Sequence, residues 1–470
     1  MSQFWQRLRQ AGRRPEAGSS AILTGPVGST LLGLSVPMIL AMFLVTGFGL
    51  VDMLYLGRFS KEAMAAVSVA FPVTYLLFTL TSALGTAATS LCSRLIGRDE
   101  SRQVRNLVLH VLLLDVVLGL LFAPLGLWLL RPIISQMGAS PEVTEGAIQY
   151  GRIIFLGTLF ALVPMTVNSL FRGEGDSIYP FKVMAAALGL NIVLNPLFIF
   201  GVGPLPRMGV QGAALTTICG FFVASLLVLR ELRNPRRTVR IDRAAWSYSP
   251  ALLRDLANVA LPALFATGST PLAVFVINSQ LAPFGTEALA AFGAGTRLLS
   301  FVFLPTLGIS MSMLVMVGQN HGAGHRQRVV RITMATLGFA LGLLAILALP
   351  VIFFPRQALG IFTDEISVIA VGIPLVQFVT IARPMLSVAN ITALWFQARG
   401  RGLAGAMPNV IMRVVAEPLG LYAGLQFGGL REGWLGMATG GFLGGGICLL
   451  ILIWRLNVYR RESSQPPLIV

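Results

Sequence analysis

Long apolar segments follow one another along most of this chain, and each is long enough to cross a lipid bilayer as a helix. The first runs from residue 29 to residue 57 and carries a single charged residue, Asp52. At about 1.5 Å per residue, such a helix spans a hydrocarbon layer of about 30 Å with some tilt. A carboxylate there is costly, so we expect Asp52 to face a bundle interior or a water-filled cavity. The alternative is that Asp52 reaches the membrane interface and is only solvated.

The composition is that of an integral membrane protein. Hydrophobic residues make up 55% of the 470 residues and charged residues 11%, whereas about 25% charged residues is usual in soluble proteins. The net charge of +16 does not indicate a nucleic-acid partner, because the arginines lie between apolar segments, chiefly on one side of the membrane. Cys92, Cys219 and Cys448 predict neither a disulfide framework nor a metal site.

Twelve apolar segments, six on each side of a polar linker, predict twelve transmembrane helices. They are residues 31–56, 63–93, 106–130, 143–170, 179–201, 211–229, 257–282, 288–317, 330–354, 367–396, 404–427 and 434–454. We therefore predict an all-α integral membrane protein with two six-helix lobes. Its predicted parts are a cytoplasmic N-terminal tail (1–28), a first lobe (29–229), a cytoplasmic linker (230–256), a second lobe (257–456) and a cytoplasmic C-terminal tail (457–470).

The placement of the arginines predicts the orientation of the helices. Arginines gather in the N-terminal tail, the second loop, the central linker, the eighth loop and the C-terminal tail. The alternate loops carry only one or two basic residues each. By the positive-inside rule, both termini and the linker lie in the cytoplasm. The N-terminal tail has no apolar core and is not a cleavable signal peptide, so we expect a multi-pass protein of the inner (plasma) membrane.

The two halves of the chain repeat at an offset of 225 residues. The matched positions include Pro37 with Pro262, Glu62 with Glu287, Gly97 with Gly322, Arg131 with Arg356, Phe171 with Phe396 and Gly175 with Gly400. Since both halves begin in the cytoplasm, the repeat is parallel, and a pseudo-two-fold axis along the membrane normal relates the lobes. Such repeats build transporters whose cavity lies between two lobes. Duplication without a functional cavity is the alternative.

Several short motifs occur in order on the predicted helices. The first helix ends in VDMLYLGRFSKEAMAAVSVAFP, the second loop reads SRLIGRDE with GQNHGAG as its partner in the other half, the fourth helix leads into FRGEGDSIYP with FQARGRG as its partner, the fifth reads NIVLNPLFIFG and the sixth begins GVQGAALTT. Together, from Leu31 to Leu456, these motifs resemble the multidrug and toxic compound extrusion (MATE) family of secondary transporters. The resemblance implies a V-shaped pair of six-helix lobes that exports organic compounds, usually cationic, against inward H⁺ or Na⁺.

The residues agree with a transporter that an ion gradient drives. The chain lacks the G-x-x-x-x-G-K-[ST] phosphate loop, so we predict no site for ATP hydrolysis. The acids well inside the predicted spans are Asp52, Asp115 and Glu417. A carboxylic acid in a low-dielectric site can load and release H⁺ if it opens alternately to each side. We expect Asp115 to be a polar residue that faces the bundle, with a proton relay as the alternative.

By the resemblance, Asp52 matches the first-helix acid of the family, which in one branch is a protonation or cation site. Its partners in that branch lie on the fourth, fifth and sixth helices, and the residues here are Asn168, Asn191, Asn195 and Thr217. Asn191 and Asn195 are four residues apart and share one helical face. The alternative for each partner is an ordinary interhelical hydrogen bond. Many members of the branch carry an acid in place of Asn195, so a lone carboxylate here favours H⁺ over a tight Na⁺ site.

The second lobe has a different charge pattern. Another branch of the family places its coupling acids on the seventh and tenth helices, but this chain has none within those spans. Arg383 and Arg413 make this lobe positive at depth, and Glu417 lies four residues after Arg413, a spacing that lets the two pair on one helix face. Arg383 and Met53 are candidates for lining a substrate cavity. An unpaired Arg383 there would favour an anionic or zwitterionic substrate.

The sequence therefore predicts an H⁺-coupled antiporter that exports lipophilic organic cations, as a monomer and without a cofactor or a metal. The alternatives are a flippase for lipid-linked or phosphorylated substrates and an exporter coupled to Na⁺. An intramembrane enzyme is disfavoured, because the sequence has no His, Asp and Glu cluster with the spacing of metal or catalytic ligands. A channel is disfavoured by the two-lobed repeat.

Overall fold

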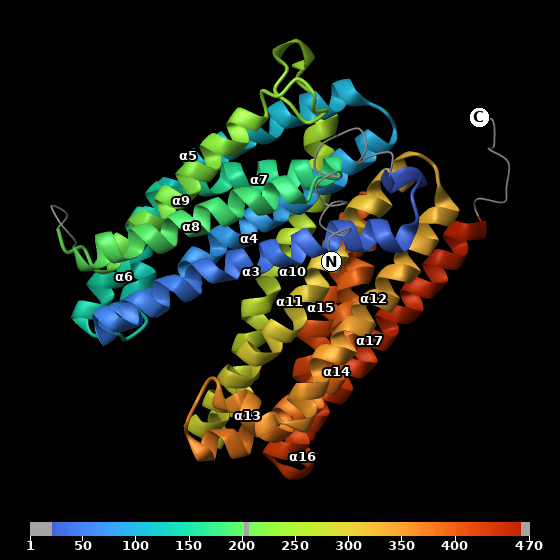
Figure 1. Ribbon diagram of the computed structural model, residues 1–470. Coiled ribbons are helices and arrows are strands. Elements are labelled where there is room, and N and C mark those ends of the chain that lie inside the picture. The colour runs from blue at the N-terminus through green and yellow to red at the C-terminus, as the bar shows by residue number, and fades with distance from the viewer. Residues whose placement is uncertain (1–20, 202–205, 462–470) are drawn as a thin grey trace, which may run out of the picture. The chain divides into compact units, whose positions relative to one another are not determined.

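The computed structural model describes residues 21–201 and 206–461, and their regular secondary structure is helical (Figure 1). Within these residues, eleven helices are long and apolar enough to cross a membrane. A bent pair of shorter helices, counted as one span, brings the number to twelve. This count agrees with the predicted twelve spans.

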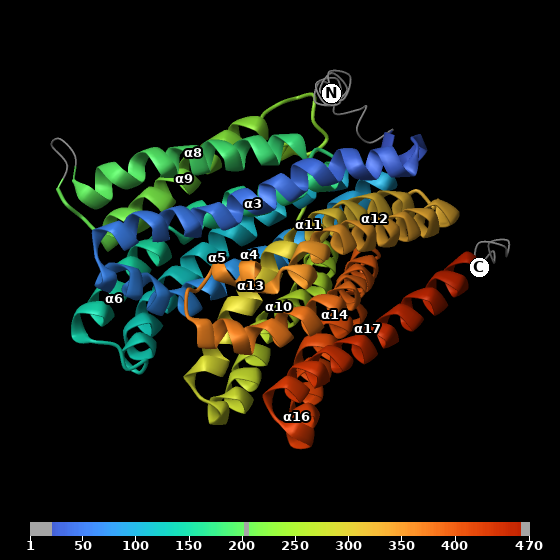
Figure 2. The ribbon, with the colours of Figure 1, turned by 60° about the horizontal axis from the view of Figure 1, so that its bottom comes forward.

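Contacts between helices divide the described chain into two units. The first unit holds residues 40–257. Its helices are the second part of α3 (Val27–Phe59), α4 (Lys61–Gly97), α5 (Ser101–Ser135), α6 (Pro141–Leu156), α7 (Thr158–Glu174), α8 (Ile178–Phe200), α9 (Val210–Glu231) and the short 3₁₀ helix η1 (Arg243–Ala245). Both Figure 1 and Figure 2 show α8 alongside α9, and the two helices pack against each other.

The second unit holds residues 21–39 and 258–461 of the described chain. Its helices are the first part of α3, most of α10 (Pro250–Leu281), η2 (Ala282–Phe284), α11 (Thr286–Gly322), α12 (Arg326–Phe353), α13 (Pro355–Gly360), α14 (Ile366–Ala398), α15 (Gly402–Val410), the π-helix η3 (Ile411–Ala416), α16 (Glu417–Gly428) and α17 (Leu430–Arg461). Within this unit, α14 packs against both α11 and α17.

The boundary between the units differs from the one expected from hydropathy, which assigned residues 29–39 to the first lobe. By its contacts, α3 up to Ile39 belongs to the second unit. A Cβ atom at Gly308 of α11 would lie 2.8 Å from the backbone nitrogen of Ile39, and the Ser312 hydroxyl lies 3.2 Å from Sδ of Met38. Hydropathy identifies a membrane span but not the helices against which it packs.

The predicted span 143–170 is not a single helix. It consists of α6 and α7, which are bent by 54° at a break marked by Gly157. A Cβ atom at Gly157 would lie only 2.3 Å from the side chain of Ile218 in α9. The break therefore lies where the chain passes directly against the side chain of Ile218.

The predicted span 404–427 contains a π-helical segment. The π-helix η3 joins α15 to α16 and carries Arg413. π-Helical turns are rare and occur frequently at functional sites.

Glycines allow α16 and α17 to approach each other closely. Gly420 and Gly424 of α16 face Gly436 and Gly440 of α17. A Cβ atom at Gly436 or Gly440 would lie 2.1 Å from a backbone carbonyl oxygen of the facing segment. Small residues at a spacing of four let helices in lipid gain van der Waals contact along their backbones.

The polar linker that follows α9 is folded against the first unit. The guanidinium of Arg237 donates to carboxylates of Glu174, Asp176 and Glu231 at 2.9, 2.7 and 2.6 Å. Burial lowers the pKa of Arg237, but the carboxylates of Asp176 and Glu174 outweigh this and raise the pKa above its ordinary value. This cluster ties the linker to the turn between α7 and α8.

A second set of contacts joins the linker to α5. The side chain of Asn106 exchanges two hydrogen bonds with the backbone of Ser247, at 2.9 and 3.2 Å. The backbone N–H of Ser249 donates to Nε2 of His110 at 3.2 Å, and Trp246 stacks on the His110 ring. The linker is therefore a docked part of the first unit, at both of its ends.

We predict that Gly440→Leu destabilises the second unit, because the new side chain would meet the backbone carbonyl of Ala416, which cannot move away without displacing the helix. A cost of about 1–3 kcal/mol or more is expected from overpacking. The thermal unfolding midpoint of the protein in detergent is the measurement. Gly446→Leu is the matched control, since a Cβ atom there meets nothing within 4 Å. Equal midpoints for the two variants would contradict the prediction.

Candidate functional site

Asp52 lies inside the first unit, close to the C-terminal end of α3. Its side chain is only 3% exposed, and its hydrogen-bond partners come from α8 and α9 of the same unit. The carboxyl group therefore points neither into the acyl chains nor into bulk water. This location matches the expectation that Asp52 faces the bundle interior.

Three side chains donate hydrogen bonds to the Asp52 carboxylate. Oδ1 accepts from Nδ2 of Asn195 at 2.8 Å and from Nδ2 of Asn191 at 3.4 Å. Oδ2 accepts from the Thr217 hydroxyl at 3.0 Å. The spacing of four residues puts both amides on one face of α8, and the packing of α9 against α8 brings Thr217 to the other oxygen.

A second layer of hydrogen bonds fixes the direction of these donors. Nδ2 of Asn195 also donates to Oδ1 of Asn191 at 3.1 Å, and the Thr216 hydroxyl donates to Oδ1 of Asn195 at 2.6 Å. Nδ2 of Asn191 lies 3.2 Å from the Thr217 oxygen. Asp52 thus accepts three hydrogen bonds and donates none, which is the pattern that an ionised carboxylate requires.

The arrangement also shows how Asp52 can accept a proton. A proton on Oδ2 would conflict with the hydroxyl hydrogen of Thr217, which points at the same oxygen. Because a hydroxyl can turn about its C–O bond, Thr217 can change from donor to acceptor without moving its helix. The site can therefore exist with either a charged or a neutral Asp52 at small structural cost.

The structure does not bring every predicted partner to Asp52. Asn168 is buried on α7, but neither its Oδ1 nor its Nδ2 has a hydrogen-bond partner among the described residues, so it is not part of this network. Thr216, which was not among the predicted partners, is part of it. Tyr150 of α6 was not among them either, and it lies close enough to interact electrostatically with Asp52. Its only signal in the sequence is a polar ring within an apolar segment.

Met53, a predicted lining residue, is 37% exposed and lies outside the hydrogen-bond network. A pocket of about 300 Å³ lies on the adjoining face of α3, and Asp52 is not among its lining residues. The residues that line it are Val51, Leu54, Tyr55, Arg58 and Ile192. The carboxylate is closed off from this pocket in the present conformation.

Asp115 is a second carboxyl group of the first unit and is separate from the Asp52 network. It is fully buried on α5, and the Thr166 hydroxyl of α7 lies 2.5 Å from its Oδ2. Its Oδ1 has no hydrogen-bond partner among the described residues. The Thr166 hydroxyl also lies 3.1 Å from the carbonyl oxygen of Leu162. Asp115 thus faces the bundle and links α5 to α7, as expected.

In the second unit, the expected pairing of Arg413 with Glu417 is wrong. The ion pairs of the described residues include neither Arg383, Arg413 nor Glu417. The spacing rule behind the expectation applies to an α-helix, whereas Arg413 lies in the π-helix η3, where the turn is wider. Both Arg413 and Glu417 are close enough to Arg383 to interact with it electrostatically.

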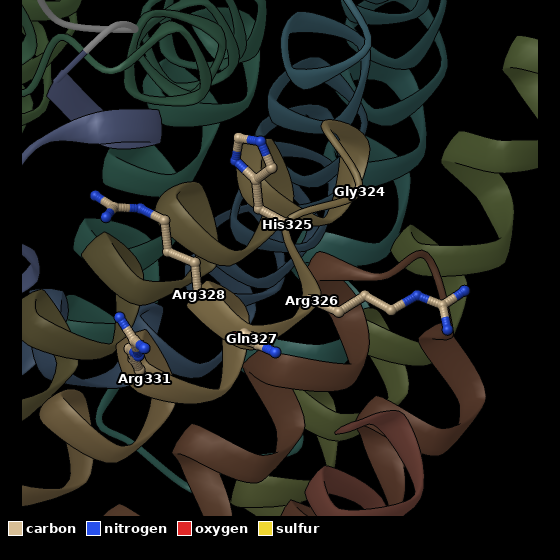
Figure 3. A pocket seen from close by; sticks show the side chains of 6 residues that line it. All are labelled: Gly324, His325, Arg326, Gln327, Arg328 and Arg331. Carbon is tan, nitrogen blue, oxygen red and sulfur yellow. The ribbon is translucent and has the colours of Figure 1, made fainter. Parts of the chain in front are cut away.

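A pocket of about 370 Å³ in the second unit, at the turn between α11 and α12, is lined mainly by basic side chains (Figure 3). Its lining residues are Gly324, His325, Arg326, Gln327, Arg328 and Arg331. The guanidinium of Arg328 donates to the backbone oxygens of Ile22 and Gly25 and so holds the start of the described chain. This pocket contains no acidic residue that could carry a proton.

Comparison with known proteins identifies relatives along most of the chain. The MatE family profile matches residues 37–197 and 262–421. A protein named FAD transporter from Shewanella oneidensis is 32% identical over 349 residues, which cover 73% of this chain and 76% of the relative. A probable multidrug resistance protein NorM from Rhizobium meliloti is 26% identical over 448 residues, covering 93% and 94% of the two chains. The multidrug export protein MepA from Staphylococcus aureus is 22% identical over 406 residues, covering 86% and 88%.

Solved structures agree with the sequence relatives. A crystal structure of MATE in the bent conformation has a TM-score of 0.89 and 25% identity, and the match covers 95% of this chain and 99% of that chain. A multidrug resistance MATE family transporter in an outward-facing conformation has a TM-score of 0.88 and 25% identity, with coverage of 94% and 98%. Members of this family are membrane transporters and not enzymes. This chain therefore belongs to the MATE family of multi-pass efflux transporters.

Proposed function

We propose that this chain is a proton-coupled efflux antiporter that exports small organic compounds, lipophilic cations among them, across the inner membrane. In this proposal it works as a monomer with both termini in the cytoplasm, and it needs no cofactor beyond the coupling ion. The single observation that carries the proposal is the buried Asp52 carboxylate, which accepts hydrogen bonds from Asn191, Asn195 and Thr217.

Asp52 supplies the coupling in this mechanism. Ionised, it adds a negative charge to the first unit and favours a bound cation. Protonated, it loses that charge, and Thr217 reverses its hydrogen bond. Two ligands that compete for one carboxylate must each weaken the binding of the other, which is the thermodynamic requirement for antiport.

The choice of H⁺ over Na⁺ rests on the ligands around Asp52. The network holds one carboxylate, two amides and two hydroxyls. Each amide turns its nitrogen, and not its oxygen, towards the Asp52 carboxylate. A sodium ion binds oxygen ligands, so both amides would have to turn over before it could bind. A proton needs only the rotation of one hydroxyl.

A second candidate is the export or flipping of phosphorylated compounds, including lipid-linked ones. Arg383 and Arg413 have no carboxylate at ion-pair distance among the described residues, and unpaired guanidinium groups are suited to phosphate. The relative from Shewanella oneidensis is named FAD transporter, and FAD carries a diphosphate. One transporter can contain both the unpaired arginines of the second unit and the Asp52 carboxyl group of the first unit.

We predict that Asp52→Asn abolishes proton-driven export of a cationic dye while the protein still folds, because asparagine keeps the shape of the side chain but cannot ionise. The measurement is dye transport in sealed vesicles, with a proton gradient and a sodium gradient imposed separately. Export by the variant is expected to fall at least about tenfold, which corresponds to about 1.4 kcal/mol.

Asp115→Asn is the matched control for this experiment. It neutralises another buried carboxyl group of the same unit that makes no contact with the Asp52 network, and we expect it to keep proton-driven export. Full export by Asp52→Asn, or an equal loss in both variants, would remove Asp52 from the mechanism.

We predict further that Asn195→Asp makes export responsive to sodium. The change would place a second carboxylate about where the amide now donates to Oδ1 of Asp52 at 2.8 Å, and two adjacent carboxylates bind a cation more tightly than one. Dye export driven by an imposed sodium gradient is the measurement, and wild type should show little of it. Asn168→Asp is the control, since Asn168 lies outside the network; sodium-driven export by both variants, or by neither, would contradict the prediction.

A further inference from the structure

We infer that the second unit carries an anion-binding site on α14 that takes the phosphate or carboxylate group of an exported molecule. The site consists of Thr380, Arg383, Ser387 and Asn390, named here the α14 polar stripe, with Arg413 close to it. The inference rests on the proposed export of small organic molecules and specifies their chemical class.

The four residues of the α14 polar stripe share one face of the helix. Their spacings are three, four and three residues, which keeps side chains in line along an α-helix. At about 1.5 Å per residue, the stripe extends over about 15 Å. It can therefore contact an extended ligand at several points.

Each member of the α14 polar stripe has a polar atom without a partner. Oγ1 of Thr380, Nε of Arg383 and Oγ of Ser387 are buried and make no hydrogen bond with any described residue, and the same holds for Nδ2 of Asn390. Buried hydroxyls elsewhere in this unit behave differently, since they donate to a carbonyl of the preceding turn. Examples are Thr306, Ser310, Thr333 and Thr392. Unsatisfied buried polar atoms are costly, so four on one helix face point to a site for a polar ligand.

Arg383 lies near the middle of α14, 17 residues after Ile366 and 15 before Ala398. That places it about 25 Å along the helix from the first end and about 23 Å from the second, in the middle of an apolar span. An arginine at such depth faces a bundle interior or a water-filled cavity. Its guanidinium has no carboxylate at ion-pair distance among the described residues.

The surroundings of Arg383 keep the site positive. Arg413 and Glu417 both lie within electrostatic range of Arg383, and neither makes an ion pair among the described residues. Glu417 packs at Gly441 of α17, beside Ala382 of α14. Two guanidinium groups against one carboxylate leave a net positive charge, which Glu417 does not neutralise by direct contact.

The chemistry of the α14 polar stripe favours an anion rich in acceptor oxygens. Arginine offers up to five N–H donors in a planar fork, asparagine two, and each hydroxyl one. The forked geometry matches a phosphate or a carboxylate. A phosphate can fill several unmet donors at once, whereas an organic cation can fill none of them.

Flavins provide the matched probes, because riboflavin, FMN and FAD share one ring system and differ in phosphate number. Binding to the full-length protein in detergent would be followed by quenching of flavin fluorescence. We expect FMN and FAD to bind at least about tenfold more tightly than riboflavin, the effect of one or two charge-assisted hydrogen bonds. The preference should shrink at high salt, since the Debye length falls to about 3 Å at 1 M.

Arg383→Gln should reduce the affinity for FMN and FAD about tenfold or more, and leave the affinity for riboflavin and for a cationic dye unchanged. Arg356→Gln is the control, because Arg356 is an exposed arginine of the same unit on α13. If Arg383→Gln does not fold, Ser387→Ala with Asn390→Ala removes donors and keeps the charge, and the comparison of the three flavins on wild type needs no variant.

Equal binding of the three flavins to wild type would overturn the inference. An equal loss of riboflavin and FAD affinity in Arg383→Gln would also overturn it, because that result indicates general damage to the protein. Displacement of FMN by lysophosphatidic acid but not by a monoacylglycerol would support the site and assign it to a lipid-linked phosphate. These are equilibrium measurements without an ion gradient, so failure of the proposed proton-driven export would leave their result intact.

Discussion

The arrangement around Asp52 depends on the free energy of burying an ionised carboxylate among apolar helices. Transfer of an ionised carboxylate out of water costs several kcal/mol even after relaxation. Three hydrogen bonds to a charged group recover about 1.5–3 kcal/mol each, and Asp52 accepts three of them. The three donors therefore offset part of the cost of the buried charge, and they come from α8 and α9, which pack against each other.

Much of this site was predictable because it depends on helix periodicity. An acid inside an apolar span predicts burial, and two asparagines four residues apart predict one shared face towards it. Asn168 shows the limit of this reasoning. Its own helix is correctly placed within a span, but that span breaks at Gly157, where α6 and α7 are bent by 54°, so periodicity counted along the whole span does not give the direction in which Asn168 points. Thr216 was not predicted alongside its neighbour Thr217, although Nδ2 of Asn191 contacts both hydroxyls.

The second unit shows how local geometry defeats a spacing rule. Arg413 and Glu417 have the spacing of a helical ion pair, yet Arg413 lies in a π-helix and Glu417 begins the α-helix that follows it. Both the π-helix and the start of α16 pack on a glycine-rich face of α17, where Gly440 and Gly444 approach Ala416. The packing of backbones therefore decides the side-chain pairing here. That packing requires glycines on α17, but a sequence rich in glycine throughout does not reveal which of them are used.

The two halves of the internal repeat differ in the charged residues that they carry within their helices. At the offset of 225 residues, Asp52 corresponds to Ile277, which lies in an apolar core cluster, and Arg383 corresponds to Thr158. Each half thus carries a charge that the other lacks at the matched position, and charge has an energetic consequence for transport. Moving one elementary charge across 100 mV is worth about 2.3 kcal/mol, so exchange of a monovalent cation for a proton gains nothing from the membrane potential. In the proposed competition of a cation and a proton for Asp52, the pH difference across the membrane therefore drives export on its own.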